Sequence, residues 1–157
     1  MPTTTYGIIG GVNYKGIELN FLFQGATGVQ QLLIQNAAWA FYNNGRVTGE
    51  WLDRWTPDRP DAPLPRLSLL SDRNNQQISS FWIQDASFIR LKNVELAYTV
   101  KSTLLTKIGA SQVRVYANGQ NLLTFTDIKN VDPENNNASG WYYPQQMTFN
   151  FGINIQF

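Results

Sequence analysis

The sequence predicts an all-β fold of about five antiparallel strands long enough to cross a lipid bilayer. Large apolar side chains occupy every odd position of residues 147–157, so this strand has one apolar and one polar face. About nine to eleven tilted residues suffice to cross a bilayer. Only 15% of residues are charged, while 13% are aromatic. The connections between the predicted strands alternate short and long, which is typical of transmembrane β-barrels.

Composition excludes several classes of site. The net charge of +1 gives no reason to expect a nucleic-acid partner. Cysteine and histidine are both absent, which excludes disulfides, thiolate nucleophiles, Cys/His metal sites and a Ser-His-Asp triad. We therefore expect neither an enzyme nor a bound cofactor. A soluble strand can also alternate, so a soluble carbohydrate-binding β-sandwich stays open as an alternative.

The first two strands are predicted over residues 6–14 and 17–24, joined by a turn at Lys15-Gly16. A long connection, 25–80, follows. Its segment 29–42 has a rough helical stripe of apolar residues, compatible with a short helix. Three spaced prolines within 60–65 then exclude a central strand or a continuous helix. A connection of this length indicates a functional loop or a domain that is not complete.

Three more strands are predicted over 81–100, 112–126 and 145–157, with a loop over 127–143. The apolar parity of 81–100 changes near Lys92-Asn93, and a one-residue β-bulge there would return the apolar side chains to one face. If Phe157 lies at the periplasmic end, then 25–80 and 127–143 are both extracellular loops.

Several segments together resemble one family. Residues 85–98 and 113–126 are similar to two successive strands near the end of the SusC/RagA family of TonB-dependent outer-membrane receptors. Asp132-Pro-Glu134, Tyr143-Pro-Gln145 and residues 148–157 follow in the family's order and spacing. Upstream, residues 54–67 are similar to the family's last large extracellular loop.

The resemblance implies that the chain is the C-terminal part of a 22-strand-class outer-membrane β-barrel, without the plug domain and signal peptide. It implies uptake of oligosaccharides in Bacteroidetes-type bacteria, with a SusD-like surface lipoprotein as partner. TonB would supply energy through the missing plug, and outer-membrane lipid would surround the barrel. The barrel-assembly machinery would read the terminal aromatic Phe157. Import of peptides or chelated iron by the same barrel stays open.

Two sets of candidate site residues follow. Four aromatic residues of the predicted extracellular loops could stack on sugar rings, or instead pack the loops and form an interfacial girdle: Trp51, Trp55, Trp141 and Tyr142. Polar residues opposite the apolar parity should face the lumen: Arg90, Lys92, Arg114, Asn118 and Gln120. The loop acids Asp53, Asp58, Asp61, Asp127, Asp132 and Glu134 are expected to be solvated or in Asx turns, rather than catalytic or calcium-binding.

Overall fold

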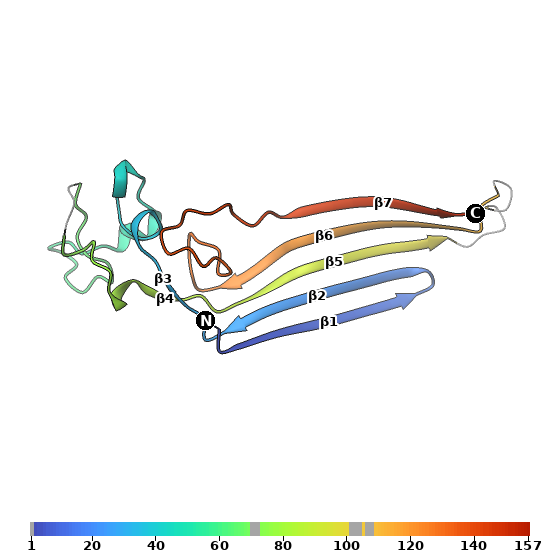
Figure 1. Ribbon diagram of the computed structural model, residues 1–157, viewed down its shortest axis with the longest axis horizontal. Coiled ribbons are helices and arrows are strands. Elements are labelled where there is room, and N and C mark those ends of the chain that lie inside the picture. The colour runs from blue at the N-terminus through green and yellow to red at the C-terminus, as the bar shows by residue number, and fades with distance from the viewer. Residues whose placement is uncertain (1, 70–72, 101–104, 106–108) are drawn as a thin grey trace. The chain divides into compact units, whose positions relative to one another are not determined.

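The structure is a computed structural model that describes all residues except 1, 70–72, 101–104 and 106–108 (Figure 1). The described residues form two compact units. The sheet unit comprises residues 2–27, 87–126 and 145–157, and the loop unit comprises 28–86 and 127–144. Within the described ranges, no helix is both long and apolar enough to cross a membrane.

The sheet unit is one antiparallel sheet of five strands. Its strands are β1 (Thr4–Tyr14), β2 (Ile17–Thr27), β5 (Phe88–Val100), β6 (Gln112–Thr126) and β7 (Thr148–Gln156). Their spatial order is β1-β2-β5-β6-β7, so β1 and β7 are the two edges of an open sheet (Figure 1). The predicted all-β fold of antiparallel strands is therefore confirmed.

The first turn is a two-residue hairpin turn at Lys15-Gly16, as predicted. Lys15 has a φ of 49° and Gly16 a φ of 85°, and a two-residue type I′ hairpin turn needs positive φ at both positions. The backbone of β5 approaches this turn, because Thr99 N donates to Gly16 O at 2.7 Å. A Cβ atom on Gly16 would lie 2.6 Å from Thr99 O, so this position requires glycine.

The β-bulge predicted in the third predicted strand is confirmed. Leu91 pairs with Phe23 of β2 and Asn93 pairs with the adjacent Leu22, which leaves Lys92 as the extra residue of β5. The register with β6 also changes between Leu91 and Asn93, but there two residues of β6, Asn121 and Leu122, lie opposite Lys92. The bulge keeps apolar residues on both sides of it on one face of the sheet.

The predicted strand over 81–100 is wrong in its first part. A 3-10 helix, η4 (Ser80–Trp82), precedes a three-residue strand β4 (Ile83–Asp85), which pairs with β3 (Gln30–Leu32) in a separate two-stranded sheet. Only from Phe88 does the chain join the large sheet. The terminal strand likewise begins at Thr148, later than the predicted 145.

The short helix suggested for 29–42 is also wrong. The segment holds β3 and the 3-10 helix η1 (Gln35–Ala37), and η2 (Tyr42–Asn44) begins at its end. Phe41, Asn43 and Asn44 have φ values of 56°, 50° and 57°, which no α-helix contains. Asparagine tolerates this left-handed conformation better than most residues, so the Asn43-Asn44 pair favours a turn.

The loop unit has a hydrophobic core of its own. Trp39, Trp51 and Trp82 form its main cluster with Ala40, and Leu33, Ala86 and Ile128 form a second. Trp51 belongs to the 3-10 helix η3 (Gly49–Asp53).

The two long connections are tied together by hydrogen bonds. Gln31 Nε2 donates to Asn135 O at 2.6 Å, and Ile34 N donates to Ala138 O at 2.8 Å. The connections therefore fold as one packed body rather than as two independent loops.

Candidate functional site

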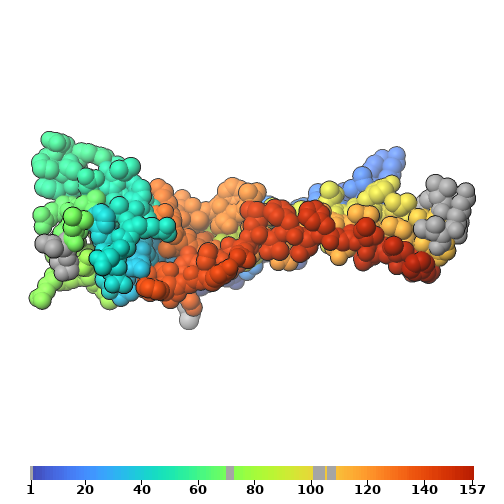
Figure 2. Space-filling model, turned by 90° about the horizontal axis from the view of Figure 1, so that it is seen from above, coloured from blue at the N-terminus to red at the C-terminus, as the bar shows by residue number. Residues whose placement is uncertain are grey.

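One face of the sheet is apolar and uncovered by any other described residue of the sheet unit. Residues that pair directly across strands share a face, so Ile17, Tyr98, Val115 and Ile153 form one apolar row across four strands. Figure 2 looks onto the β7 edge of the sheet, where the residues of β7 (red) lie at the surface. The exposed large apolar residues on the rows of this face are Ile8, Val12, Tyr14, Ile17, Leu19, Leu96, Tyr98, Val115, Leu123, Phe125, Phe149, Phe151, Ile153 and Ile155.

The exposed apolar residues of this face are contiguous, whereas those on the surface of a soluble protein are usually scattered singly. Phe151 is 80% exposed, and a groove of about 660 Å³ runs between it and the row of Ile17, Val115 and Ile153. Contiguous exposed apolar surface of this kind marks contact with a membrane or with another protein.

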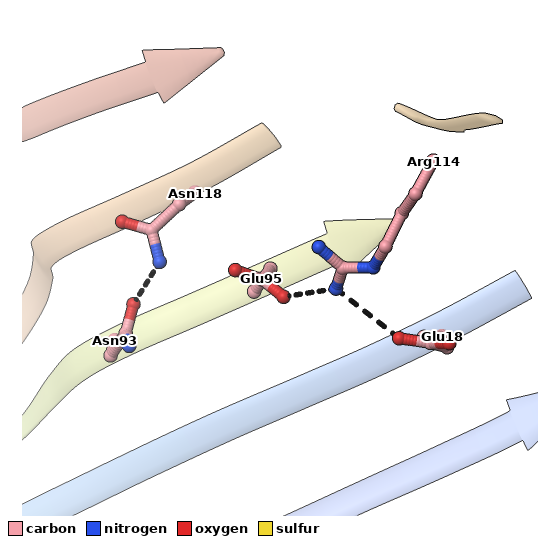
Figure 3. A network of polar contacts seen from close by, with 5 residues as sticks. All are labelled: Glu18, Asn93, Glu95, Arg114 and Asn118. Atoms are coloured by element: carbon pink, nitrogen blue, oxygen red, sulfur yellow. Dashed lines mark hydrogen bonds and ion pairs between the residues drawn. The ribbon is translucent and has the colours of Figure 1, made fainter. Parts of the chain in front are cut away.

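The opposite face carries a network of polar side chains (Figure 3). The Arg114 guanidinium donates to Glu95 at 2.6 Å and to Glu18 at 3.2 Å, which links β6 to β5 and β2. Nearby, Asn118 Nδ2 donates to Asn93 Oδ1 at 2.6 Å. The network couples three strands through side chains as well as through the backbone ladder.

The predicted lumen residues divide into three kinds of environment. Arg114 and Asn118 belong to the network, and Gln120 lies in the same polar row as Asn93. Arg90 is only 2% exposed, and its Nε donates to Thr124 Oγ1 at 2.7 Å. Lys92 is the extra residue of the bulge of β5 against β2.

Sequence reasoning missed the partners of Arg114. Glu18 alternates with the apolar residues of β2, and Glu95 does the same in β5. The sequence does place Arg114 and these two glutamates on the polar side of their strands. It does not give the strand register that brings Glu18 near Arg114, 96 positions away.

The four loop aromatics do not form one platform. Trp51 is 7% exposed, and its ring centroid lies 6.5 Å from that of Trp82, so it has the packing role left open by the sequence. The Tyr142 hydroxyl is half-buried and accepts from Asp132 N at 2.6 Å. Trp55 and Trp141 are 40% and 63% exposed. These two are the most exposed of the four.

Trp55 borders a groove of about 630 Å³ with Phe81. The prolines of this region form part of the groove, with Pro63 and Pro65 among its lining residues. The backbone of Trp55 is held there because its N–H donates to Leu64 O at 2.7 Å. An indole at a groove edge supplies a flat apolar surface with a polar N–H.

The loop acids make turns and surface ion pairs. Asp132 Oδ1 accepts from Glu134 N at 2.9 Å, which is an Asx turn and confirms that expectation for this loop. The side chains of Asn135 and Asn137 accept in the same way from the backbone N–H two residues further on. Asp53 pairs with the exposed Arg59 at 2.9 Å. Across the described residues, no group of three or more acidic side chains is placed to hold a metal ion.

Comparison with known proteins gives matches along the whole chain. TonB-dependent receptors P3 and P26 of Formosa agariphila are each 32% identical to it, over 99% and 100% of the chain. TonB-dependent receptor SusC of Bacteroides thetaiotaomicron is 34% identical over 51% of the chain. No protein-family model matches. The chain spans only 16% and 17% of the length of P3 and P26.

Solved structures give the same result. A structure of the RagAB peptide transporter superposes with a TM-score of 0.76 and 30% identity over 98% of the chain. The RagAB peptide importer in its open-open state superposes with a TM-score of 0.75 and 30% identity over 100% of the chain. In both cases the chain covers 17% of the solved chain.

Arg114→Gln should destabilise the sheet, because it removes both ion pairs and leaves the Glu18 and Glu95 carboxylates near each other without a cation. The midpoint temperature of thermal unfolding should therefore fall, and adding Glu95→Gln should recover part of the loss by removing that repulsion. Arg59→Gln, which breaks an exposed ion pair, is the control and should change the midpoint little. Equal midpoints for Arg114→Gln and Arg59→Gln would show that the network is not stabilising.

Trp51→Ala should lower the free energy of unfolding by roughly 3–5 kcal/mol, the usual cost of deleting a buried tryptophan. Trp141→Ala removes an exposed ring and should leave that free energy within about 0.5 kcal/mol. The free energy of unfolding of each variant is measured by denaturant titration, with limited proteolysis of the loop unit as the readout. Comparable losses in the two variants would refute the assignment of packing to Trp51 alone.

Proposed function

Because the chain belongs to the SusC/RagA family of TonB-dependent outer-membrane receptors, we propose that it supplies the C-terminal strands and two extracellular loops of a nutrient importer. The observation that carries this proposal is the match to a solved importer along the whole chain, at 30% identity and a TM-score of 0.75. The soluble β-sandwich alternative is not retained, since these relatives are outer-membrane β-barrel receptors.

The two faces of the sheet support opposite environments. The apolar face contacts outer-membrane lipid, and the face with Arg114 and Asn118 lines the lumen, where polar side chains can bind one another or the plug. The edges β1 and β7 pair with further strands, because unpaired backbone groups are not tolerated at a lipid boundary. The complete barrel is of the 22-strand transporter class.

Import is the activity of the assembled receptor rather than of this segment. TonB supplies energy through the plug, and a SusD-like lipoprotein covers the extracellular loops. Phe157 follows directly after β7, and its aromatic side chain is the proposed signal for the barrel-assembly machinery. The segment performs no catalysis in this role.

Oligosaccharide is the proposed cargo, and the exposed rings of Trp55 and Trp141 favour it, because a flat aromatic face can pack against a sugar ring. Peptide is the second candidate, because the solved RagAB neighbours, at 30% identity, are structures of a peptide importer or transporter. Among the described residues, none favours chelated iron.

Ile153→Arg should reduce assembly of the full-length receptor in the outer membrane, because a charge on the lipid face is unfavourable, by about 2–4 kcal/mol at the bilayer midplane and less toward the interfaces. Asn150→Arg places the same charge on the lumen face, opposite the neutral Asn118, and should assemble normally. The measurement is receptor abundance in the outer-membrane fraction. Equal abundance of the two variants would contradict a lipid contact for Ile153.

Uptake assays with the wild-type receptor test the cargo. Labelled oligosaccharides should enter cells in a TonB-dependent manner and labelled peptides should not. The reverse result would assign the receptor to peptide import, and uptake of neither would contradict the proposed import of nutrients from these classes.

A further inference from the structure

A cleft in the loop unit is walled by both long connections. It has a volume of about 790 Å³ and is lined by residues between 36 and 49 and between 130 and 144. This volume lies within the range of roughly 300–1,000 Å³ that is usual for small-molecule sites. The two connections approach each other closely at the cleft: there is so little space between Gly140 and Ala37 that a Cβ atom added to Gly140 would lie 3.1 Å from Ala37 Cβ.

Aromatic side chains of the cleft are fixed by the fold. Trp39 is 9% exposed, and its ring meets Tyr42 edge to face with centroids 5.3 Å apart. Tyr142 is held from the other connection by the hydrogen bond from Asp132 N. Rings that are already ordered lose little conformational entropy when a ligand binds.

Arg46 is the charged residue that lines the cleft, and no acidic side chain lines it among the described residues. Within the part of the chain that the structure describes, Arg46 makes no ion pair or hydrogen bond, and its side chain is exposed. Two other arginines of the loop unit are engaged: Arg54 donates to Trp51 O at 3.3 Å, and Arg59 pairs with Asp53. The cleft therefore holds a cation whose hydrogen-bonding capacity is open to a ligand.

We propose that this cleft binds a carboxylate-bearing part of the cargo. The Arg46 guanidinium donates to the carboxylate in the two-pronged geometry that arginine offers, and Tyr42 and Tyr142 contact the less polar part of the ligand. The carboxylate comes from a uronic acid sugar or from the C-terminus of a peptide. This inference rests on the proposed import function, and it narrows the cargo from any sugar or peptide to one that carries an anionic group.

The test is calorimetric binding to the purified full-length receptor with two pairs of probes. One pair is a galacturonic acid trisaccharide and its neutral galactose counterpart. The other is N-acetylated tetra-alanine with a free or an amidated C-terminus. In at least one pair the carboxylate probe should bind about 10- to 100-fold tighter than its neutral counterpart, the range expected for a charge-assisted hydrogen bond.

Arg46→Gln should abolish that preference, and Arg46→Lys should keep part of it, because lysine retains the charge but not the forked geometry. Arg59→Gln makes the same change of charge outside the cleft and should keep the preference of the wild type. The pair that shows the preference identifies the source of the carboxylate, sugar or peptide.

The proposal is overturned if the wild type binds the charged and neutral members of both pairs equally, or if Arg46→Gln retains the preference. Neither result touches the import function, which is measured separately by assembly in the outer membrane and by TonB-dependent uptake. Loss of uptake of every cargo by the wild type, in contrast, would overturn the import function and leave the binding data on the cleft intact.

Discussion

The register between neighbouring strands is the constraint on which the sheet unit depends. Directly paired residues share a face, so a slip of one residue in any strand would move its apolar side chains to the polar face. The bulge at Lys92 matters for this reason, since it keeps Leu91 and Val94 on the same face of β5. The pairs from Arg114 to Glu95 and Glu18 form only in this register, so the polar network and the apolar rows specify the same alignment.

Periodicity was sufficient to predict most of the sheet. Apolar and polar residues alternate in three strands: the one from Ile17, the one from Gln112 and the last one. This alternation identifies each strand without knowledge of the strand it pairs with. Residues 83–85 also have extended backbone, but periodicity cannot say which strand they pair with, and they pair with β3 instead of the large sheet. The change of parity at Lys92 could be read because apolar residues flank it on both sides.

The loop unit could not be predicted in the same way. Nothing local distinguishes Trp51, which is buried against Trp82, from Trp141, which is exposed, because burial there depends on contacts between distant segments. The cleft near Arg46 combines residues from two connections about 90 positions apart, and the local sequence of neither connection shows that they meet. Positive φ at Phe41 was likewise unpredictable, because aromatic residues rarely adopt it.

A packed loop unit has a consequence for the proposed function. Its tryptophan core and the hydrogen bonds from Gln31 and Ile34 hold the two connections in one arrangement. Cargo would then meet a preformed surface, with exposed rings at Trp55 and Trp141 and a cation at Arg46, and would not have to order mobile loops on binding.

Single-cysteine scanning of β7 tests the two-faced sheet most directly, because the chain itself contains no cysteine. Each position from Thr148 to Gln156 is replaced in the full-length receptor, with cysteines elsewhere removed, and labelled in intact outer membranes. Odd positions should react with a lipid-soluble maleimide and even positions with a water-soluble one, in strict alternation. Equal reaction of both sets with the water-soluble reagent would contradict a lipid-facing apolar side.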